Sequence, residues 1–302
     1  MKKFFMAIIA IMMAASVSPQ FYVYLNNGEV LYADSISMVA PPNGMLPGEF
    51  SVSATQKVHF SQGNLQATYN GSRWNWSFAA HQWDCIGNTS ANNTINGNGS
   101  VSSNGTVDLF GWSTAATYYG INNSTSSNTY SGGFVEWGNN PITNGGKIAQ
   151  MWRTLTKDEW VYLFFGRKDA AKLFSMGKVN GVNGTILLPD NWSGNKYDNA
   201  KDGLTAQGNL YSSRGNASFT FHTYDGKVWD DMEKAGAVFL PAAGYRLEEA
   251  NGDVNVGVSF GYYWSATPYD EIRVYDFSFS EDGLAPQGKF GRYYGSSVRL
   301  VR

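Results

Sequence analysis

The segment from residue 260 to residue 302 constrains the fold more tightly than any other part of the chain. It carries the aromatic run GYYWSAT near its start and the apolar run SVRLV near its end, and Tyr, Asp, Ser, Gly and Phe crowd together between them. Residues 274–280 alternate apolar or aromatic side chains with Asp or Ser, which predicts a strand with one face in the core and one in solvent. Residues 262–266 and 297–301 are also predicted strands. We therefore expect a C-terminal sheet that displays a contact surface within residues 260–302.

Two helices are expected upstream of this sheet. Thr156 and Glu159 form a capping box in the sequence TKDE, and the apolar residues that follow recur at helical spacing. A second, shorter helix is expected over residues 228–235, ended by Gly236. Many short apolar or alternating segments separated by turn residues accompany these helices, so the predicted fold class is α+β.

Composition limits the class of protein. The chain has 302 residues and a single cysteine, which excludes an internal disulfide framework. Aromatic residues and charged residues each make up 15% of the chain, which suits a loop-rich globular domain and not a disordered one. The formal net charge of −2 argues against a nucleic-acid partner, which would need a basic surface. Residues 87–106 are almost all Asn, Gly, Ser and Thr, and are expected to form a polar loop without core residues.

The N-terminal region is expected to direct export. Two lysines precede an apolar run too short to span a bilayer, so residues 1–20 are interpreted as a signal peptide, with an uncleaved anchor as the alternative. The expected location is therefore secreted or on the cell surface. Residues 21–40 are predicted to form a hairpin and residues 41–49, rich in Pro and Gly, a linker. The main domain is then expected over residues 50–302.

Several Trp- and Gly-bearing segments, taken in order, resemble secreted gut-bacterial proteins of the major-paralogous (FISUMP-like) type. These segments are VHFSQGNLQ (58–66), FAAHQWDCIG (78–87), DLFGWS (108–113), MWRTLTKDEWVYLF (151–164), VNGTILLPDNW (182–192), AGAVFLPAAGYR (235–246), GYYWSAT (261–267) and SVRLVR (297–302). The resemblance implies a C-type-lectin-like fold in its formylglycine-generating-enzyme variant, with short antiparallel sheets, two helices, long loops and a C-terminal display surface.

A narrower resemblance concerns residues 269–296. They are similar to the variable region of target proteins of diversity-generating retroelements, which are C-type-lectin-like and end in an RLV-type strand. Adenine-directed mutagenesis of Asn codons yields mostly the residue types found here, and the segment contains no Asn. Glu271, Glu281, Gln287 and Lys289 do not arise by that route, so a fixed lectin-like surface stays open as the alternative.

Neither a catalytic nor a metal site is expected from the sequence, and no cofactor. The three histidines are scattered without metal-ligand spacing. Relatives that generate formylglycine use paired cysteines, whereas Cys85 stands alone and is interpreted as a buried thiol. No catalytic serine or phosphate-binding motif occurs. The chain is therefore interpreted as a non-enzyme, with an unusual enzyme of the formylglycine-generating fold as an alternative.

The favoured function is an adhesin-type module that recognises a protein or a glycan. Tyr, Phe and Arg supply contact area and orientation in such surfaces. The candidate ligand-binding residues are Tyr269, Asp270, Glu271, Ile272, Arg273, Ser278, Ser280, Glu281, Asp282, Phe290, Tyr293 and Tyr294. Two turns and the exposed side of one strand are expected to place them together at one end of the molecule. The alternative is a structural or tip subunit of a surface fibre, assembled through residues 21–38.

Aromatic and basic residues outside that segment carry further expectations. Most tryptophans lie in alternating or helical patterns and are predicted to be core residues. Trp137 and Trp192 adjoin Gly, Asn or Pro and are candidates for exposed platforms that stack on sugar rings. Arg246 and Arg299 sit in apolar strands and are predicted to pair internally with a carboxylate or with carbonyl groups.

Overall fold

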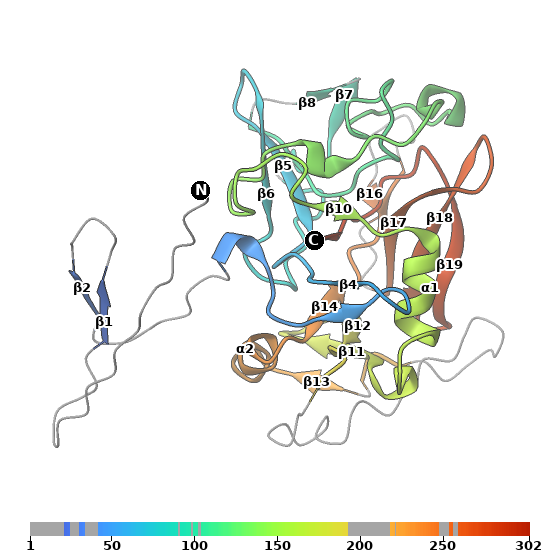
Figure 1. Ribbon diagram of the computed structural model, residues 1–302. Helices are drawn as coiled ribbons and strands as arrows, with labels where there is room; N and C mark the ends of the chain where they lie inside the picture. The colour runs from blue at the N-terminus through green and yellow to red at the C-terminus, as the bar shows by residue number, and fades with distance from the viewer. Residues whose placement is uncertain are drawn as a thin grey trace, which may run out of the picture. The chain divides into compact units, whose positions relative to one another are not determined.

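The computed structural model describes residues 21–24, 30–33, 42–89, 91–97, 99–101, 104–192, 218–220, 222–247, 254–255 and 259–302 (Figure 1). The chain divides into two compact units, Met1–Pro42 and Asn43–Arg302. The expected signal peptide, residues 1–20, lies outside the described residues. Within the described part, none of the helices is both long enough and apolar enough to cross a bilayer.

The first unit contains a two-stranded antiparallel sheet. Strands β1 (Phe21–Tyr24) and β2 (Val30–Ala33) pair in register, with Phe21 opposite Ala33 and Tyr24 opposite Val30. These strands agree with the predicted hairpin. Its turn, residues 25–29, and residues 34–40 lie outside the described residues.

In the described part of the second unit, short strands accompany two helices. The strands are β3 (Phe50–Ser51), β4 (Lys57–Val58), β5 (Leu65–Tyr69), β6 (Trp74–Phe78), β7 (Ile95–Gly97), β8 (Ser100–Val101), β9 (Thr106–Val107), β10 (Arg153–Thr154), β11 (Phe174–Val179), β12 (Val182–Leu187), β13 (Thr223–Tyr224), β14 (Val238–Pro241), β15 (Tyr245–Arg246), β16 (Val254–Asn255), β17 (Phe260–Pro268), β18 (Arg273–Ser280), β19 (Gly283–Gly291) and β20 (Leu300–Val301). The helices are α1 (Lys157–Phe165) and α2 (Gly226–Lys234), and short 3-10 turns occupy Pro42–Gly44, Ser127–Tyr130, Trp137–Asn139 and Ala170–Lys172.

The strand pairs are mostly antiparallel. The widest sheet has the order β13-β11-β12-β14, in which only the β11–β13 pair is parallel. The sheet with the longest strands has the order β17-β18-β19, and smaller sheets are β6-β5-β9, β3-β4, β7-β8, β10-β20 and β15-β16. Mixed helices and short antiparallel sheets confirm the α+β class.

Helix α1 begins at the predicted capping box. The Thr156 hydroxyl accepts a hydrogen bond from the backbone N–H of Glu159 at 3.3 Å, and the Glu159 carboxylate accepts one from the backbone N–H of Thr156 at 2.8 Å. The apolar face of the helix is buried, and the helix lies against β18 and β19 (Figure 1). The Trp160 and Phe164 rings stack on Phe277 of β18 at 5.2 and 4.7 Å.

Helix α2 begins two residues earlier than expected. The Asp225 side chain caps it by accepting a hydrogen bond from the backbone N–H of Val228 at 2.8 Å. This aspartate extends the helix to Gly226 because it satisfies one of the free N–H groups of the first turn. The predicted stop is confirmed, since Gly236 follows the helix with a φ of +102°.

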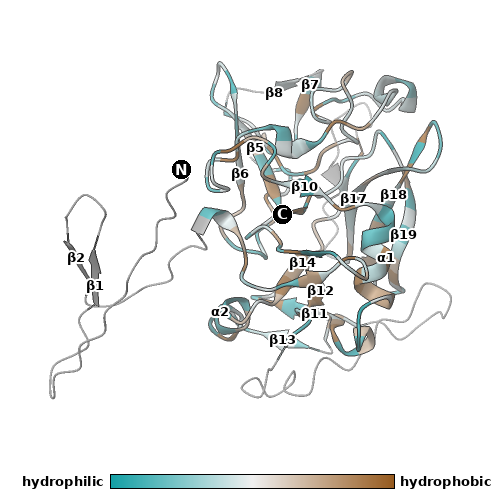
Figure 2. Ribbon diagram, in the orientation of Figure 1, coloured by the Kyte–Doolittle hydropathy of each residue, from teal (hydrophilic) through white to brown (hydrophobic). Residues whose placement is uncertain are grey.

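The core of the second unit has three large clusters of buried side chains, described next, and a small fourth one formed by Leu109 and Ala243. One lies between α1 and the β17-β18-β19 sheet, and another surrounds α2, β12 and β14; Figure 2 shows hydrophobic brown on β12 and β14. The remaining large one is rich in tryptophan. Its indole-bearing members are Trp76, Trp112, Trp137, Trp152 and Trp264.

Two expectations about surface residues were wrong. Trp137 is fully buried, and its indole N–H donates to the carbonyl of Tyr119 at 2.8 Å, so it is no exposed platform. The segment 87–106 does contribute to the core, through Ile95 and Val101. Asn93 in this segment is buried and hydrogen-bonds to the backbone of Gly87, Asp108 and Leu109. These bonds hold the polar segment against the domain, so two apolar side chains are enough to anchor it in the core.

The predicted internal pairing of two arginines is confirmed. Arg246 donates to the carbonyls of Leu109 at 3.2 Å and Asn122 at 3.1 Å. Arg299 donates to the side-chain carbonyls of Gln82 at 2.6 Å and Asn64 at 3.4 Å.

The start of the main unit also differs from expectation. Leu46 is fully buried, and its N–H donates to the carbonyl of Phe60 at 2.9 Å. Residues 43–49, which were expected to belong to a linker, therefore lie within the compact unit.

Candidate functional site

The β17-β18-β19 sheet carries most of the candidate residues. Its register places Asp276 of β18 between Trp264 and Gly288, and Ser278 opposite Tyr262. Successive side chains on a strand point to opposite faces. One face of the sheet packs on α1 through Phe277. The other face bears Tyr262, Asp276 and Ser278.

Six aromatic residues gather on and beside this second face, and we call them the aromatic ladder. Its members are Tyr245, Phe260, Tyr262, Phe290, Tyr293 and Tyr294. Four of the rings form a continuous stack: Tyr262 lies 4.4 Å from Phe290, Phe290 lies 4.1 Å from Tyr294, and Tyr294 lies 4.4 Å from Tyr293. The Tyr245 ring stands edge-on to this stack.

Every ring of the ladder is half-buried. Each ring is therefore held in place by neighbouring residues, while part of it stays in contact with solvent. Hydrogen bonding with Tyr293 and partial burial raise the pKa of Tyr294 to about 12. The Tyr294 phenol thus keeps its proton over the physiological range and remains a hydrogen-bond donor.

A buried carboxyl group lies beneath the ladder. Asp276 is 1% exposed, and neither carboxyl oxygen has a hydrogen-bond partner in the part of the chain that the structure describes. Burial raises its pKa to about 8, and the nearby Ser278 hydroxyl lowers it only in part, from a position that does not complete a hydrogen bond. The carboxyl is therefore mostly protonated at neutral pH.

The missing side chain of Gly288 makes room for this carboxyl. A Cβ atom at position 288 would lie 2.5 Å from Asp276 Oδ1 and 2.6 Å from Ser278 Oγ. The register of β18 and β19 shifts between Asp276 and Ser278 as well. Any larger residue at position 288 would collide with the acid.

The solvent-exposed face predicted for β18 was therefore wrong. Asp276 and Ser278 are both buried, because rings from β17 and β19 cover the face that alternation assigned to water. Alternation of apolar and polar residues along one strand predicts that its two faces differ in polarity. It does not predict whether side chains from neighbouring strands bury the polar face.

A second group of candidate residues forms the turn between β17 and β18. The Asp270 carboxylate accepts hydrogen bonds from the Arg273 guanidinium at 2.9 and 2.7 Å, and this contact lowers the pKa of Asp270. The Tyr269 ring lies 4.8 Å from the Arg273 guanidinium and 4.0 Å from the Lys289 ammonium. Tyr269 and Ile272 are 38% and 51% exposed, so this hairpin tip presents aromatic and apolar surface.

Arg292 ties the hairpin tip to the body of the domain. Its guanidinium donates to the carbonyls of Asp270 at 2.7 Å and Tyr130 at 3.1 Å, and it stacks on Trp112 at 4.6 Å. Ser127 adds a hydrogen bond to the carbonyl of Ile272 at 3.1 Å. The tip is therefore held from two sides.

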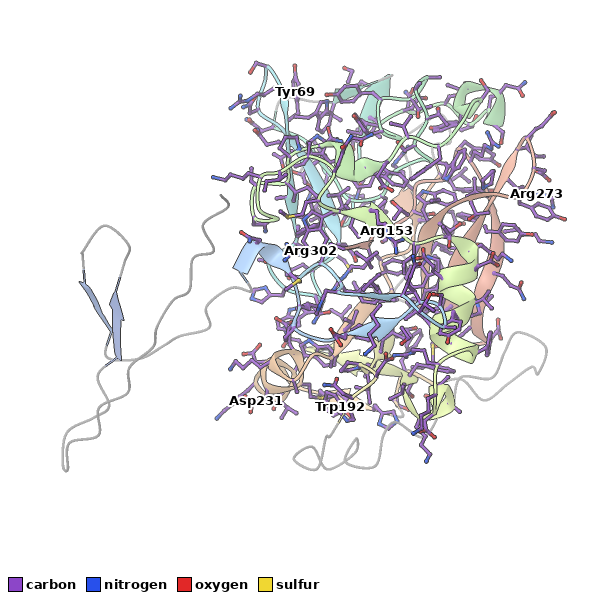
Figure 3. All side chains as sticks on the ribbon, in the orientation of Figure 1. Tyr69, Arg153, Trp192, Asp231, Arg273 and Arg302 are labelled. Carbon is purple, nitrogen blue, oxygen red and sulfur yellow. The ribbon has the colours of Figure 1, made fainter. Side chains whose placement is uncertain are left out.

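The candidate residues do not meet at one end, so that part of the prediction was wrong. Residues 269–273 form one end of β18, where Figure 3 shows Arg273 projecting at the hairpin tip, and Glu281 and Asp282 turn the chain at its other end. A strand of eight residues spans about 23 Å at roughly 3.3 Å per residue. Consecutive turns of a meander alternate between ends. Ser280 lies at that same far end, whereas Phe290, Tyr293 and Tyr294 join the ladder above the buried Ser278.

The sequence reasoning missed half of the ladder. Phe260 and Tyr262 alternate along β17 on the side of the ladder, a signal that the sequence does contain. Tyr245 comes from a separate strand and joins the ladder only through the fold. Trp192, proposed as an exposed platform, is half-buried against the cluster around α2.

The chemistry of Cys85 follows from its surroundings. Burial, with the nearby Asp108 and Asp84 carboxylates, raises the pKa of the thiol. A protonated thiol is a poor nucleophile and a poor metal ligand. Among the described residues, no group of three or more His, Cys, Asp or Glu side chains converges as a metal site would require.

Comparison with known proteins gives no match: no family model, no curated protein and no solved structure matches the chain.

Proposed function

We propose that this chain is a secreted or cell-surface ligand-binding protein and that the aromatic ladder is its contact surface for a protein or glycan. The observation that carries the proposal is a set of six half-exposed rings locked against one another on one face of a sheet. Such rings offer large contact area with little conformational entropy to lose. The phenol hydroxyls add directional hydrogen bonds.

The fold class supports this proposal. Short antiparallel sheets and two helices agree with a C-type-lectin-like fold of the formylglycine-generating-enzyme variant, in which a C-terminal surface is displayed. We propose that fold and membership of the FISUMP-like group on the strength of the ordered segments quoted above. The retroelement-target proposal applies to residues 269–296, which supply the hairpin tip and three rings of the ladder.

Replacement of ladder residues should weaken binding without unfolding the protein. We expect Tyr262→Ala and Phe290→Ala each to weaken binding by about tenfold or more, since central aromatic residues contribute about 2 kcal/mol or more at contact surfaces. Tyr118→Ala, an exposed tyrosine outside the ladder, is the matched control and should change affinity less than twofold. The measurement is binding to the best ligand found on a glycan array or in a displayed protein library. Equal loss in the control, or no loss in both ladder variants, would contradict the proposal.

The N-terminal hairpin supports a second proposal, a role in a surface fibre. A two-stranded sheet is marginally stable alone and gains stability when further strands pair with it. We expect removal of residues 21–38 to abolish ordered assembly, measured by light scattering and electron microscopy of the purified protein. Binding through the ladder should be unchanged in the same variant. Assembly that persists after the deletion would exclude this route.

A further inference from the structure

We propose that Asp276 makes the order of the aromatic ladder depend on pH: the neutral carboxyl supports the stacked rings, and the ionised carboxylate loosens them. Ligand release at alkaline pH would follow, and that consequence alone rests on the proposed function. The ladder and its buried acid are described by the structure independently of any ligand.

The position of Asp276 couples it to the ladder. It lies on the central strand between Trp264 and Gly288, on the sheet face that carries Tyr262 and Phe290. Phe290 follows two residues after Gly288 on β19 and stacks on Tyr262 at 4.4 Å. A movement of β19 that admits water to the acid would therefore also displace Phe290, which stacks on both Tyr262 and Tyr294.

Among the residues that the structure describes, the neighbours of Asp276 on its own face of the sheet carry no positive charge. From β17 it faces Trp264 and Tyr262, from β19 Gly288 and Phe290, and on its own strand Ser278. Tyr262 is the one neighbour among these five residues with a titratable side chain. Arg273 of β18 and Lys289 of β19 alternate onto the opposite face of the sheet, which leaves Arg292, just beyond the end of β19, as the cation to consider.

That cation is engaged elsewhere. Arg292 stacks on Trp112, and its guanidinium donates to the carbonyls of Tyr130 and Asp270. Its electrostatic partners are Asp270 and Glu271. An ionised Asp276 therefore lacks both hydrogen bonds and a counter-ion among the described residues, which is a state that burial strongly disfavours.

Gly288 provides the route by which ionisation would disturb the sheet. It is half-buried, and the position of its absent side chain touches both Asp276 Oδ1 and Ser278 Oγ. Water that hydrates the carboxylate would enter beside Gly288 and separate β18 from β19 at the existing register shift. Phe290 would then leave its place between Tyr262 and Tyr294.

The sign of the pH effect follows from proton linkage. Burial raises the pKa of Asp276 in the folded protein to about 8, above the value of about 3.9 in an unfolded chain. The folded state therefore holds the proton more tightly, so its stability is greatest below about pH 4 and falls as pH rises towards the folded-state pKa. The loss contributed by this one group is about tenfold in the folding equilibrium constant per pH unit in that window.

The test compares wild type with Asp276→Asn and Asp276→Val between pH 5 and pH 9. The folding equilibrium constant is measured by urea unfolding at each pH. As the pH rises to about 8, the wild-type constant should fall by about tenfold more per pH unit than that of either variant. Near-UV circular dichroism should show the wild-type aromatic signal decreasing near pH 8, with no such change in the variants. Asp282→Asn, the same substitution at the exposed turn, should behave as wild type.

These readouts need no ligand, so they separate this proposal from the proposed function. Other buried acids, such as Asp108, titrate equally in all four proteins and cancel in the comparison. Parallel pH profiles of wild type and either folded Asp276 variant would overturn the proposal. A pH effect without any ligand binding would retain the switch and remove the binding role.

Discussion

Arg299→Ala is expected to lower the free energy of unfolding by about 3–5 kcal/mol, because it removes the charged donor to Gln82 from a buried polar network. Arg299 is 1% exposed and donates to Gln82 Oε1 at 2.6 Å. Gln82 Oε1 also accepts the N–H of Phe239 at 2.7 Å, and Gln82 Nε2 donates to Glu233 at 2.8 Å. Removal of the guanidinium would leave this amide and the Glu233 carboxylate without the nearby positive charge.

Urea unfolding followed by tryptophan fluorescence measures this loss. Arg299→Lys should also be destabilised, since an ammonium cannot reproduce the fork that reaches both Gln82 and Asn64. Arg153→Ala is the matched control: Arg153 contacts Glu159 at 2.6 Å, but its side chain is 38% exposed, so the loss should be at most about 1 kcal/mol. Equal losses at positions 299 and 153 would show that burial does not set the effect.

Trp264→Ala should be comparably severe, with a loss of about 3–5 kcal/mol. The indole is 1% exposed, lies in the tryptophan-rich cluster, and donates to the carbonyl of Phe110 at 2.6 Å. Alanine would create a cavity and remove one of the two donors to that carbonyl, which would keep only the Ser296 N–H at 2.8 Å. For a unit of this size, the thermal midpoint should fall by roughly 2–4 °C per kcal/mol.

Differential scanning calorimetry would check this value. Trp83→Ala is the control of the same residue type: Trp83 is half-buried and stacks on His81 at 4.7 Å, so its removal should cost far less. A Trp264 variant as stable as the Trp83 variant would contradict the assignment of Trp264 to the core. Asp276 lies directly opposite Trp264, so this variant should also alter the near-UV signal of the ladder.

Local rules predicted the elements that local chemistry determines. Helix α1 follows from the capping box and an apolar face, both encoded within ten residues of Thr156. The strand at residues 274–280 was predicted for the same reason, since alternation is a property of one segment. The start of α2 was missed because the capping role of Asp225 is one of several that an aspartate can have before a short helix.

The candidate site was predicted only in part because it depends on pairing between segments. Phe290, Tyr293 and Tyr294 were identified by residue type, whereas Tyr245 enters the ladder from a strand that the sequence does not link to it. The burial of Asp276 depends on a glycine in the next strand and on rings from both neighbours. Similarly, Trp137 adjoins glycine and asparagine in sequence, but the fold buries it.

Strand β20 is buried in the core, and its long-range contacts affect when the domain can fold. Its Val301 bridges Phe60 and pairs with Arg153, and Arg299 contacts Asn64, 235 positions earlier. Contacts over such separations form slowly, and here they join the earliest and latest synthesised parts of the second unit. The ribosome must therefore finish the segment near residue 300 before the core can close, and a chain truncated ahead of it would expose apolar surface to chaperones and proteases.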